Sequence, residues 1–448
     1  MERICDAMPA KPFDLIVFNG MALTMDADFT VLQKALIGVR RGRLVEIGSW
    51  PETQPLPAAR EAIDARGGLI LPGLVNAHTH LPMALFRGLA DDLPLERWLN
   101  DHIFPAEARI MAPEAVRAGT RLACAELLLG GVTTCCDGYF LETHVAEAVV
   151  ESGMRAVLGQ GVVDFPAPGV ADPGKNIRTA ADFVQVWRDR HLLITPSIFC
   201  HSPYTCSAQT LVQAKRATRA AGVLFQIHAA ETLAEAASIQ RQEGLSPTAY
   251  LDRLGLLDQR TLLVHAVWTD EDDIATMARR GVAVVHAPES NMKLASGICP
   301  VTALLEAGIR VGLGSDGCAS NNNQDLFGEM GSAARLQKAA HQDPAQLSVA
   351  AVLKMATIEG ARAIGLGHEV GSLEVGKAAD VIVIDTNQPH LIPLYSAASH
   401  LVYAARAADV RHVIVAGATL VKDGTLLSMP VAAVMAEARR WGREIAAL

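Results

Sequence analysis

The chain has 448 residues, of which 50% are hydrophobic and 19% charged, so a large apolar core is expected and a disordered chain is excluded. The net charge of −9 and the 5% content of aromatic residues argue against a surface that binds nucleic acid. No apolar run of about 18 residues occurs, and residues 1–7 lack the apolar stretch of a secretion signal. We therefore expect a cytoplasmic protein with reduced cysteines that binds neither nucleic acid nor membrane.

Both ends of the chain are predicted to be rich in short strands. These strand-like segments are residues 14–20, 35–47, 379–385 and a hairpin over 413–421. Turns are predicted at Arg41–Gly42 and at residues 422–424, the latter closing the hairpin. We expect residues 1–70 and 369–448 to pair into one small discontinuous β-sandwich domain.

The intervening residues 71–368 alternate apolar, strand-like runs with helical stretches, a pattern typical of repeated βα units. The predicted fold class is therefore α/β, with a (β/α)8 barrel of the TIM type as the main domain. Eight candidate strands end near His80, Asp137, Val163, His201, His228, His265, His286 and Asp316. Because active sites of such barrels lie at the C-terminal ends of the strands, these polar side chains are candidates for chemistry. The Pro/Gly-rich stretch 166–173 is predicted to face the substrate.

The sharpest chemical signal is the pair His78 and His80 at the end of the apolar run that starts at Leu71. Side chains two apart in an extended chain point to the same side, so both imidazoles can reach one ion. An isolated pair of this kind more often caps a polar loop, but here His228, His265 and Asp316 close other strands. Nitrogen and carboxylate ligands suit zinc, with iron or manganese as alternatives, and a bound metal lowers the pKa of its water to roughly 7.

Three stretches carry a family resemblance: 72–80 (PGLVNAHTH), 228–232 (HAAET) and 314–317 (GSDG). Together they resemble the amidohydrolase superfamily, in its cytosine deaminase-like and nucleoside deaminase-like branch. Four further stretches are similar to those of methylthioadenosine/S-adenosylhomocysteine/adenosine deaminases: 85–94, 104–107, 201–204 and 288–294. This resemblance runs nearly end to end and implies a hydrolytic deaminase of adenosine-type nucleosides that releases the inosine analogue and ammonia.

The resemblance also implies a set of metal ligands. One zinc ion per subunit would be held by His78, His80, His228 and Asp316. His265 would polarise or orient the attacking water beside it. Asp316 would in addition take the proton of that water and relay it to the departing amine.

Three more residues receive roles from the resemblance. Glu231, three residues beyond His228, would donate a proton to the ring nitrogen next to the attacked carbon; the alternative is a solvated carboxylate opening the next helix. Glu107 would bind the ribose hydroxyls, or be an ordinary helix carboxylate. His201 would contact the nucleoside, or be a buried histidine tied to the backbone.

One position departs from relatives that accept S-adenosylhomocysteine, which can place an arginine where Gln160 stands here. Lys175 or Arg178 could substitute for it, and we favour adenosine and 5'-methylthioadenosine as substrates. Alternatives are an aminohydrolase of a pterin, a guanine-type base or an amino-triazine, and a barrel that has lost activity. We expect the protein to form a homo-oligomer and to bind a small nucleoside as its substrate.

Overall fold

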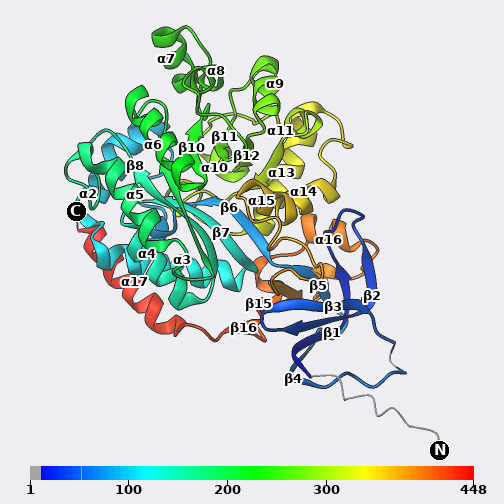
Figure 1. Ribbon diagram of the computed structural model, residues 1–448. Coiled ribbons are helices and arrows are strands. Elements are labelled where there is room, and N and C mark those ends of the chain that lie inside the picture. Colours follow the sequence, from blue (N-terminus) through cyan, green and yellow to red (C-terminus); the bar gives the residue numbers. More distant parts are fainter. Residues whose placement is uncertain (1–11, 52, 448) are drawn as a thin grey trace, which may run out of the picture.

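The computed structural model describes residues 12–51 and 53–447, and within them eight parallel strands form a barrel (Figure 1). The strands are, in chain order, β6 (Leu74–Thr79), β7 (Val132–Tyr139), β8 (Arg155–Val162), β9 (Ile194–Cys200), β10 (Phe225–Ala229), β11 (Thr261–His265), β12 (Ala283–His286) and β13 (Arg310–Leu313). Each strand pairs with the next, and a parallel bridge between Thr79 and Asp316 brings the last strand to the first. The predicted (β/α)8 barrel is confirmed.

The barrel strands are buried along almost their whole length, which explains why they read as continuous apolar runs in the sequence. The predicted strand ends agree with the observed ones. The largest difference is at β13, which ends at Leu313 instead of Asp316. Asp316 lies beyond the strand with a left-handed φ of 60°, and within the described chain its only strand pairing is the isolated bridge to Thr79.

Helices follow the strands and form the outer layer of the barrel (Figure 1). They are α1 (Leu95–Arg97), α2 (Phe104–Ile110), α3 (Pro113–Leu129), α4 (Glu142–Ser152), α5 (Asn176–Trp187), α6 (Ala208–Ala221), α7 (Leu233–Glu243), α8 (Pro247–Arg253), α9 (Glu271–Arg280), α10 (Pro288–Lys293), α11 (Val301–Glu306), α12 (Cys318–Asn321), α13 (Leu326–His341), α14 (Val349–Met355), α15 (Ile358–Ala363), α16 (Ala397–Tyr403) and α17 (Val431–Ala446). Helix α6 shows how sequence sets their bounds, because the Ser207 hydroxyl caps its first turn and Gly222, at φ 68°, ends it.

The two ends of the chain build a second, mixed sheet below the barrel (Figure 1). Its strands are β1 (Phe13–Leu23), β2 (Val31–Arg40), β3 (Arg43–Ser49), β4 (Ala59–Asp64), β5 (Leu69–Pro72), β14 (Val381–Ile384), β15 (Val410–Val415), β16 (Ala418–Lys422) and β17 (Thr425–Leu426). The order is β17-β16-β15-β14-β5-β1-β2-β3, with β4 also on β1. Strands from both chain ends enclose one apolar core, to which Val17, Ile37 and Val383 belong. This confirms the discontinuous β domain.

The predicted hairpin over 413–421 pairs as expected, with Val413 opposite Val421, but its turn was misplaced. The chain reverses at Ala416 and Gly417, which both have positive φ, whereas Asp423–Gly424 closes a second hairpin between β16 and β17. Both are two-residue turns with two left-handed residues, and Ala416 gives no sequence signal for that conformation.

The β domain is fixed to the barrel by a buried ion pair, in which Arg155 of β8 lies 3.0 Å from Asp380, just before β14. The C-terminal helix α17 instead packs on α3 of the barrel, where Arg121 pairs with Glu437 at 2.9 Å. The division into residues 1–70 with 369–448 and residues 71–368 stays a prediction.

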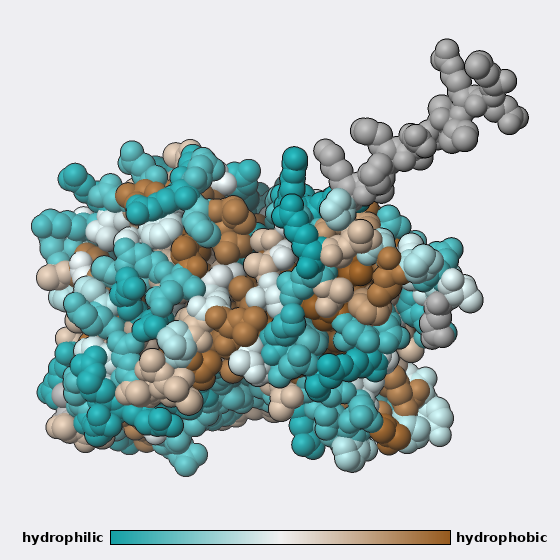
Figure 2. Space-filling view, turned by 90° about the horizontal axis from the view of Figure 1, so that it is seen from below, coloured by the Kyte–Doolittle hydropathy of each residue, from teal (hydrophilic) through white to brown (hydrophobic). Residues whose placement is uncertain are grey.

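Hydrophilic residues cover most of the face seen in Figure 2, with apolar patches toward its middle. No helix in the described part of the chain is long and apolar enough to cross a membrane. The seven cysteines among the described residues are free and buried. Cys5 and the remainder of residues 1–7, on which the prediction of no signal segment rests, lie outside the described residues.

Candidate metal centre and active site

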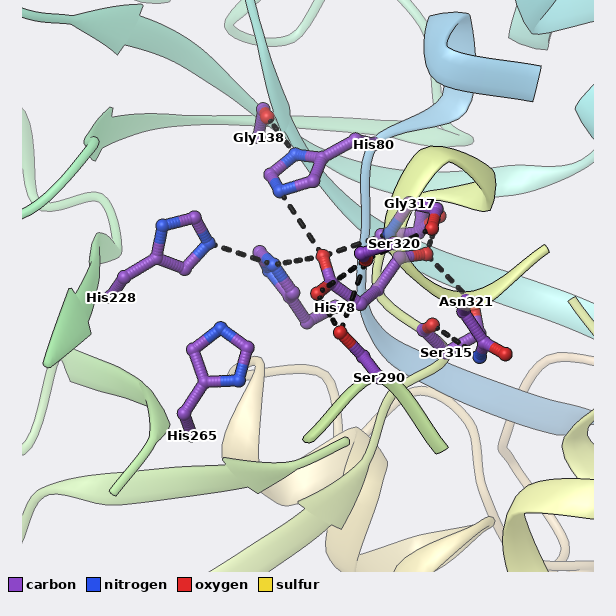
Figure 3. A network of polar contacts seen from close by, with 12 residues as sticks. His78, His80, Gly138, His228, His265, Ser290, Ser315, Gly317, Ser320 and Asn321 are labelled. Carbon is purple, nitrogen blue, oxygen red and sulfur yellow. Dashed lines mark hydrogen bonds and ion pairs between the residues drawn. The ribbon is translucent and has the colours of Figure 1, made fainter. Parts of the chain in front are cut away.

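Four side chains converge at the C-terminal end of the barrel: His78, His80, His228 and Asp316. One ligand atom from each lies within 4.8 Å of all the others. The Nε2 atoms of His78 and His228 are 3.1 Å apart, and Asp316 Oδ1 lies 3.3 Å from His80 Nε2. Figure 3 shows the three imidazoles pointing toward one another. The structure thus brings together the four side chains that the sequence singled out as metal ligands.

The His80 ring is held so that the lone pair of its Nε2 faces the centre of this cluster, where the Nε2 atoms of His78 and His228 also meet. His80 Nδ1 lies 2.6 Å from the carbonyl oxygen of Gly138, so this nitrogen carries the proton and Nε2 is left as a free ligand. Burial lowers the pKa of His78 to about 4 and that of His228 well below its ordinary value. Neutral imidazoles are the form that binds metals.

Asp316 is oriented by donors on both of its oxygens. Its Oδ1 accepts the N–H of Gly317 at 2.8 Å, while Oδ2 accepts the hydroxyls of Ser290 at 2.6 Å and Ser320 at 3.0 Å (Figure 3). Burial alone would raise the pKa of Asp316, but the neighbouring histidines, His78 first, hold it well below its ordinary value. The carboxylate is therefore ionised and aimed at the imidazoles.

His265 closes β11 beside the cluster but is not one of the four convergent donors. Its backbone adopts a φ of 77°, and the amide nitrogen of Asn291 lies 3.0 Å from its Nδ1. Because an amide nitrogen can only donate, Nδ1 accepts and the ring proton sits on Nε2. Burial lowers the pKa of His265 to about 4, so the ring is a neutral donor.

Glu231 is a buried carboxyl group that lies 3.7 Å from His265 Nε2. The chain turns sharply before it, with Ala230 at φ 54°, and the two oxygens of Glu235 accept the N–H groups of Ala230 and Glu231. Burial, followed by the charge of Asp316, raises the pKa of Glu231 to about 8. A solvated helix carboxylate, the alternative weighed from the sequence, does not describe this environment.

A cavity of about 440 Å³ adjoins the cluster and is lined by His80 and Phe199 on one side. Glu107 of α2 and His201 after β9 line it as well, so the structure brings both predicted substrate-binding residues to the same cavity. Glu107 is 4% exposed and accepts the hydroxyl of Tyr139. Burial raises the pKa of Glu107 to about 7.

His201 is held by the hydroxyl of Thr205, 3.0 Å from its Nδ1, and burial lowers the pKa of this ring to about 3. The rest of the cavity is mostly apolar, with contributions from helix α2 and from the Pro/Gly-rich loop 166–171 after β8. This loop was predicted to face the substrate, and it does line the cavity.

No lysine or arginine of the described chain lines this cavity. Gln160 is buried, and its side-chain oxygen accepts the N–H of Glu142. The side chains of Lys175 and Arg178 are 72% and 86% exposed and lie beside Asp172 and Asp182. Neither side chain lines the cavity.

Several residues of the site escaped the sequence reasoning. Ser290 and Asn291 orient Asp316 and His265, and both lie in the stretch 288–294 that carried part of the resemblance. Tyr139, which holds Glu107, follows Asp137 by two residues on β7. The strand period would have placed Tyr139 on the same side as Asp137, but only the fold brings α2 beside it.

Histidines and a carboxylate that converge at the C-terminal ends of barrel strands are the arrangement of a metal-dependent hydrolase. The chain belongs to the amidohydrolase family, whose sequence profile matches residues 69–420. It is 46% identical to a 5-methylthioadenosine/S-adenosylhomocysteine deaminase of Syntrophobacter fumaroxidans, over 98% of this chain and 100% of that protein. It is 41% identical to a 5'-deoxyadenosine deaminase of Methanosarcina mazei, over 97% and 99%. An adenosine deaminase structure from Xanthomonas campestris with bound zinc superposes with a TM-score of 0.95 at 38% identity, covering 98% of this chain and 99% of that one.

Proposed function

We propose that the protein is a zinc-dependent hydrolytic deaminase of adenosine-type nucleosides, with adenosine and 5'-methylthioadenosine as the favoured substrates. The products are the inosine analogue and ammonia. The observation that carries this proposal is the convergence of three imidazole nitrogens and one carboxylate beside a buried acid, Glu231, and a nucleoside-sized cavity. The names of the relatives at 41% and 46% identity support the same substrate class.

The donor set fits zinc. His78, His80, His228 and Asp316 would hold one ion per subunit, because they offer three imidazole nitrogens and one carboxylate oxygen. Without a cation, the lone pairs of His78 Nε2 and His228 Nε2 would face each other at 3.1 Å. A bound zinc ion supplies a water of lowered pKa as the nucleophile at neutral pH.

The side chains around the reacting carbon handle the protons. Glu231, protonated at neutral pH, donates its proton to the ring nitrogen next to the attacked carbon while the oxygen of water forms the new C–O bond. The ionised Asp316 takes one proton of that water and passes it to the amino group, so that the C–N bond breaks and ammonia leaves. The remaining O–H proton returns to Glu231 as the C=O bond of the product forms, which restores the acid. The Nε2–H of His265 orients the attacking oxygen from the side.

The cavity accounts for binding of the sugar. Glu107 would accept hydrogen bonds from the ribose hydroxyls, since Tyr139 occupies only one of its oxygens. His201, fixed by Thr205, would contact the nucleoside from β9. The 5' end of the substrate then faces the apolar part of the cavity, which suits 5'-deoxy and 5'-methylthio groups. The amino-acid carboxylate of S-adenosylhomocysteine finds no cation among the described lining residues, so this substrate should be poor.

The proposal is tested by measuring ammonia release from adenosine, 5'-methylthioadenosine and S-adenosylhomocysteine, with a pterin, guanine and an amino-triazine as competitors. We expect the first two nucleosides to be turned over with the highest kcat/KM. Faster release from one of the free heterocycles than from either nucleoside would contradict the assignment. Zinc, iron and manganese analysis of the purified protein identifies the metal.

Two further expectations go with this proposal. Assembly into a homo-oligomer is a prediction from the sequence, and light scattering of the purified protein tests it. Cytoplasmic location is a second one, for which cell fractionation is the test.

A further inference from the structure

We propose that Asp137 and Glu142 form a carboxylic acid–carboxylate pair that shares one proton and positions His80 on one side and Tyr139 on the other. Asp137 lies near the end of β7, and Glu142 is the first residue of α4. Neither residue takes part in the chemistry described above. Their effect on turnover rests on the proposed function, whereas the pair itself can be detected without it.

One oxygen of each carboxyl group accepts a hydrogen bond from the backbone. Asp137 Oδ1 accepts the N–H of Leu81 at 2.6 Å, and Glu142 Oε1 accepts the N–H of Tyr139 at 2.8 Å. The second oxygens, Asp137 Oδ2 and Glu142 Oε2, are buried and have no hydrogen-bond donor among the described residues. Besides burial, which raises both pKa values, the two side chains act on each other's pKa as hydrogen-bonding neighbours, which raises the pKa of Glu142 and lowers that of Asp137. Two acceptor oxygens can bond only through a proton between them.

Both residues are fully buried, at 0% exposure, and neither forms an ion pair with a described lysine or arginine. Two ionised carboxylates in contact at such a site would repel each other without compensation, so one of them keeps its proton. Burial, followed by the charge of Asp137, raises the pKa of Glu142 well above its ordinary value. The remaining negative charge is shared across the pair and faces two backbone N–H donors.

The pair connects the two sides of the active site. Leu81, which Asp137 binds, directly follows His80, and the carbonyl that holds the His80 ring belongs to Gly138, the neighbour of Asp137. Glu142 binds the backbone of Tyr139, whose hydroxyl reaches Glu107 in the cavity. The shared proton therefore positions a histidine of the metal cluster and the residue that holds the ribose-binding carboxylate.

Amide substitutions give a sharp test because of their fixed donor and acceptor ends. In Asp137→Asn, the oxygen still accepts the N–H of Leu81, and the new amide N–H donates to the Glu142 carboxylate. Glu142→Gln works in the same way toward Asp137. In the double variant, both backbone bonds can be kept only if two NH2 groups face each other, which are both donors.

We expect each single variant to keep its zinc and to retain kcat/KM for adenosine and the melting temperature within about threefold and a few degrees, respectively. The double variant should lose roughly tenfold or more in kcat/KM beyond the product of the two single effects, and should melt lower than either. Glu235→Gln is the matched comparison: both oxygens of Glu235 accept backbone N–H groups, so one amide there must break a bond.

Infrared spectroscopy at pH 7.5 detects the pair directly. Difference spectra of the wild-type protein against each single variant should show the carbonyl stretch of one neutral carboxylic acid, because the remaining partner is ionised in each single variant. The band of protonated Glu231 is common to all three proteins and cancels in the difference. A wild-type spectrum that matches Glu142→Gln in this region, or single variants as damaged as the double variant, would overturn the proposal. If wild-type protein releases no ammonia from any nucleoside but shows the band and the non-additive melting, the pair stands and the proposed function fails.

Discussion

The active site has two walls that are built differently. The chemical wall consists of histidines at the ends of β6, β10 and β11 and of Asp316, three residues after β13. Hydrogen bonds to the backbone or to a neighbouring side chain fix His80, His265 and Asp316. The cavity wall is made by α2 and by the loop 166–171, and it is mostly apolar. The comparison teaches that the reaction is set on rigid strands, while substrate choice is set on segments that tolerate change.

The strongest test of the chemical wall is His228→Ala, which removes an imidazole 3.1 Å from that of His78. We expect zinc content to fall from one ion per subunit to near zero and kcat/KM to drop on the order of 10⁴-fold, since metal activation is worth several kcal/mol. Metal analysis and ammonia release measure the two effects. The matched control is His286→Asn, a buried histidine at the end of β12 that is not one of the four donors and should leave the zinc in place.

Replacing Glu231 separates proton transfer from metal binding on the same wall. Glu231→Gln keeps the size of the side chain but cannot supply an acidic proton, so kcat/KM should fall on the order of 10³-fold with full zinc content. Atomic absorption and steady-state kinetics provide the measurement. Near-normal turnover by this variant would remove Glu231 from the mechanism.

The pH dependence of kcat/KM tests the protonation state in which Glu231 acts. Burial raises the pKa of Glu231 to about 8, so the acid form needed for catalysis prevails below that pH and disappears above it. We expect kcat/KM for adenosine to fall about tenfold per pH unit on the alkaline side, with the break near the pKa of Glu231. A profile that stays flat to high pH contradicts a catalytic acid with this pKa.

The cavity wall is tested by Ala171→Arg, which places a cation on an exposed lining residue of the loop after β8. The kcat/KM ratio of S-adenosylhomocysteine to 5'-methylthioadenosine should rise roughly tenfold, the value of one hydrogen bond to a charged group. Ala171→Gln, of similar length but uncharged, is the control and should leave the ratio unchanged. An equal ratio in both variants would show that the amino-acid end does not reach this loop.

The two walls also differed in how well sequence patterns predicted them. His78 and His80 could be recognised together because two residues of one strand share a side by strand geometry alone. The convergence of His228 and Asp316 with them followed from the rule that parallel strands present their C-terminal ends at one face. By contrast, Tyr139 and Glu107 come from separate elements, and no local sequence pattern predicts the hydrogen bond between them.

The sequence by itself determined the barrel and the β domain formed by the chain ends, because periodicity and strand ends are local properties that burial then enforces. The family resemblance then selected the four donors among the polar residues at the strand ends. Tertiary structure alone decided that Lys175 and Arg178 stay outside the cavity, that the Ala416–Gly417 turn closes the hairpin, and that the acids Asp137 and Glu142 are buried on the backbone of Leu81 and Tyr139. These features depend on which segments become neighbours in space, and that depends on the packing of the whole chain.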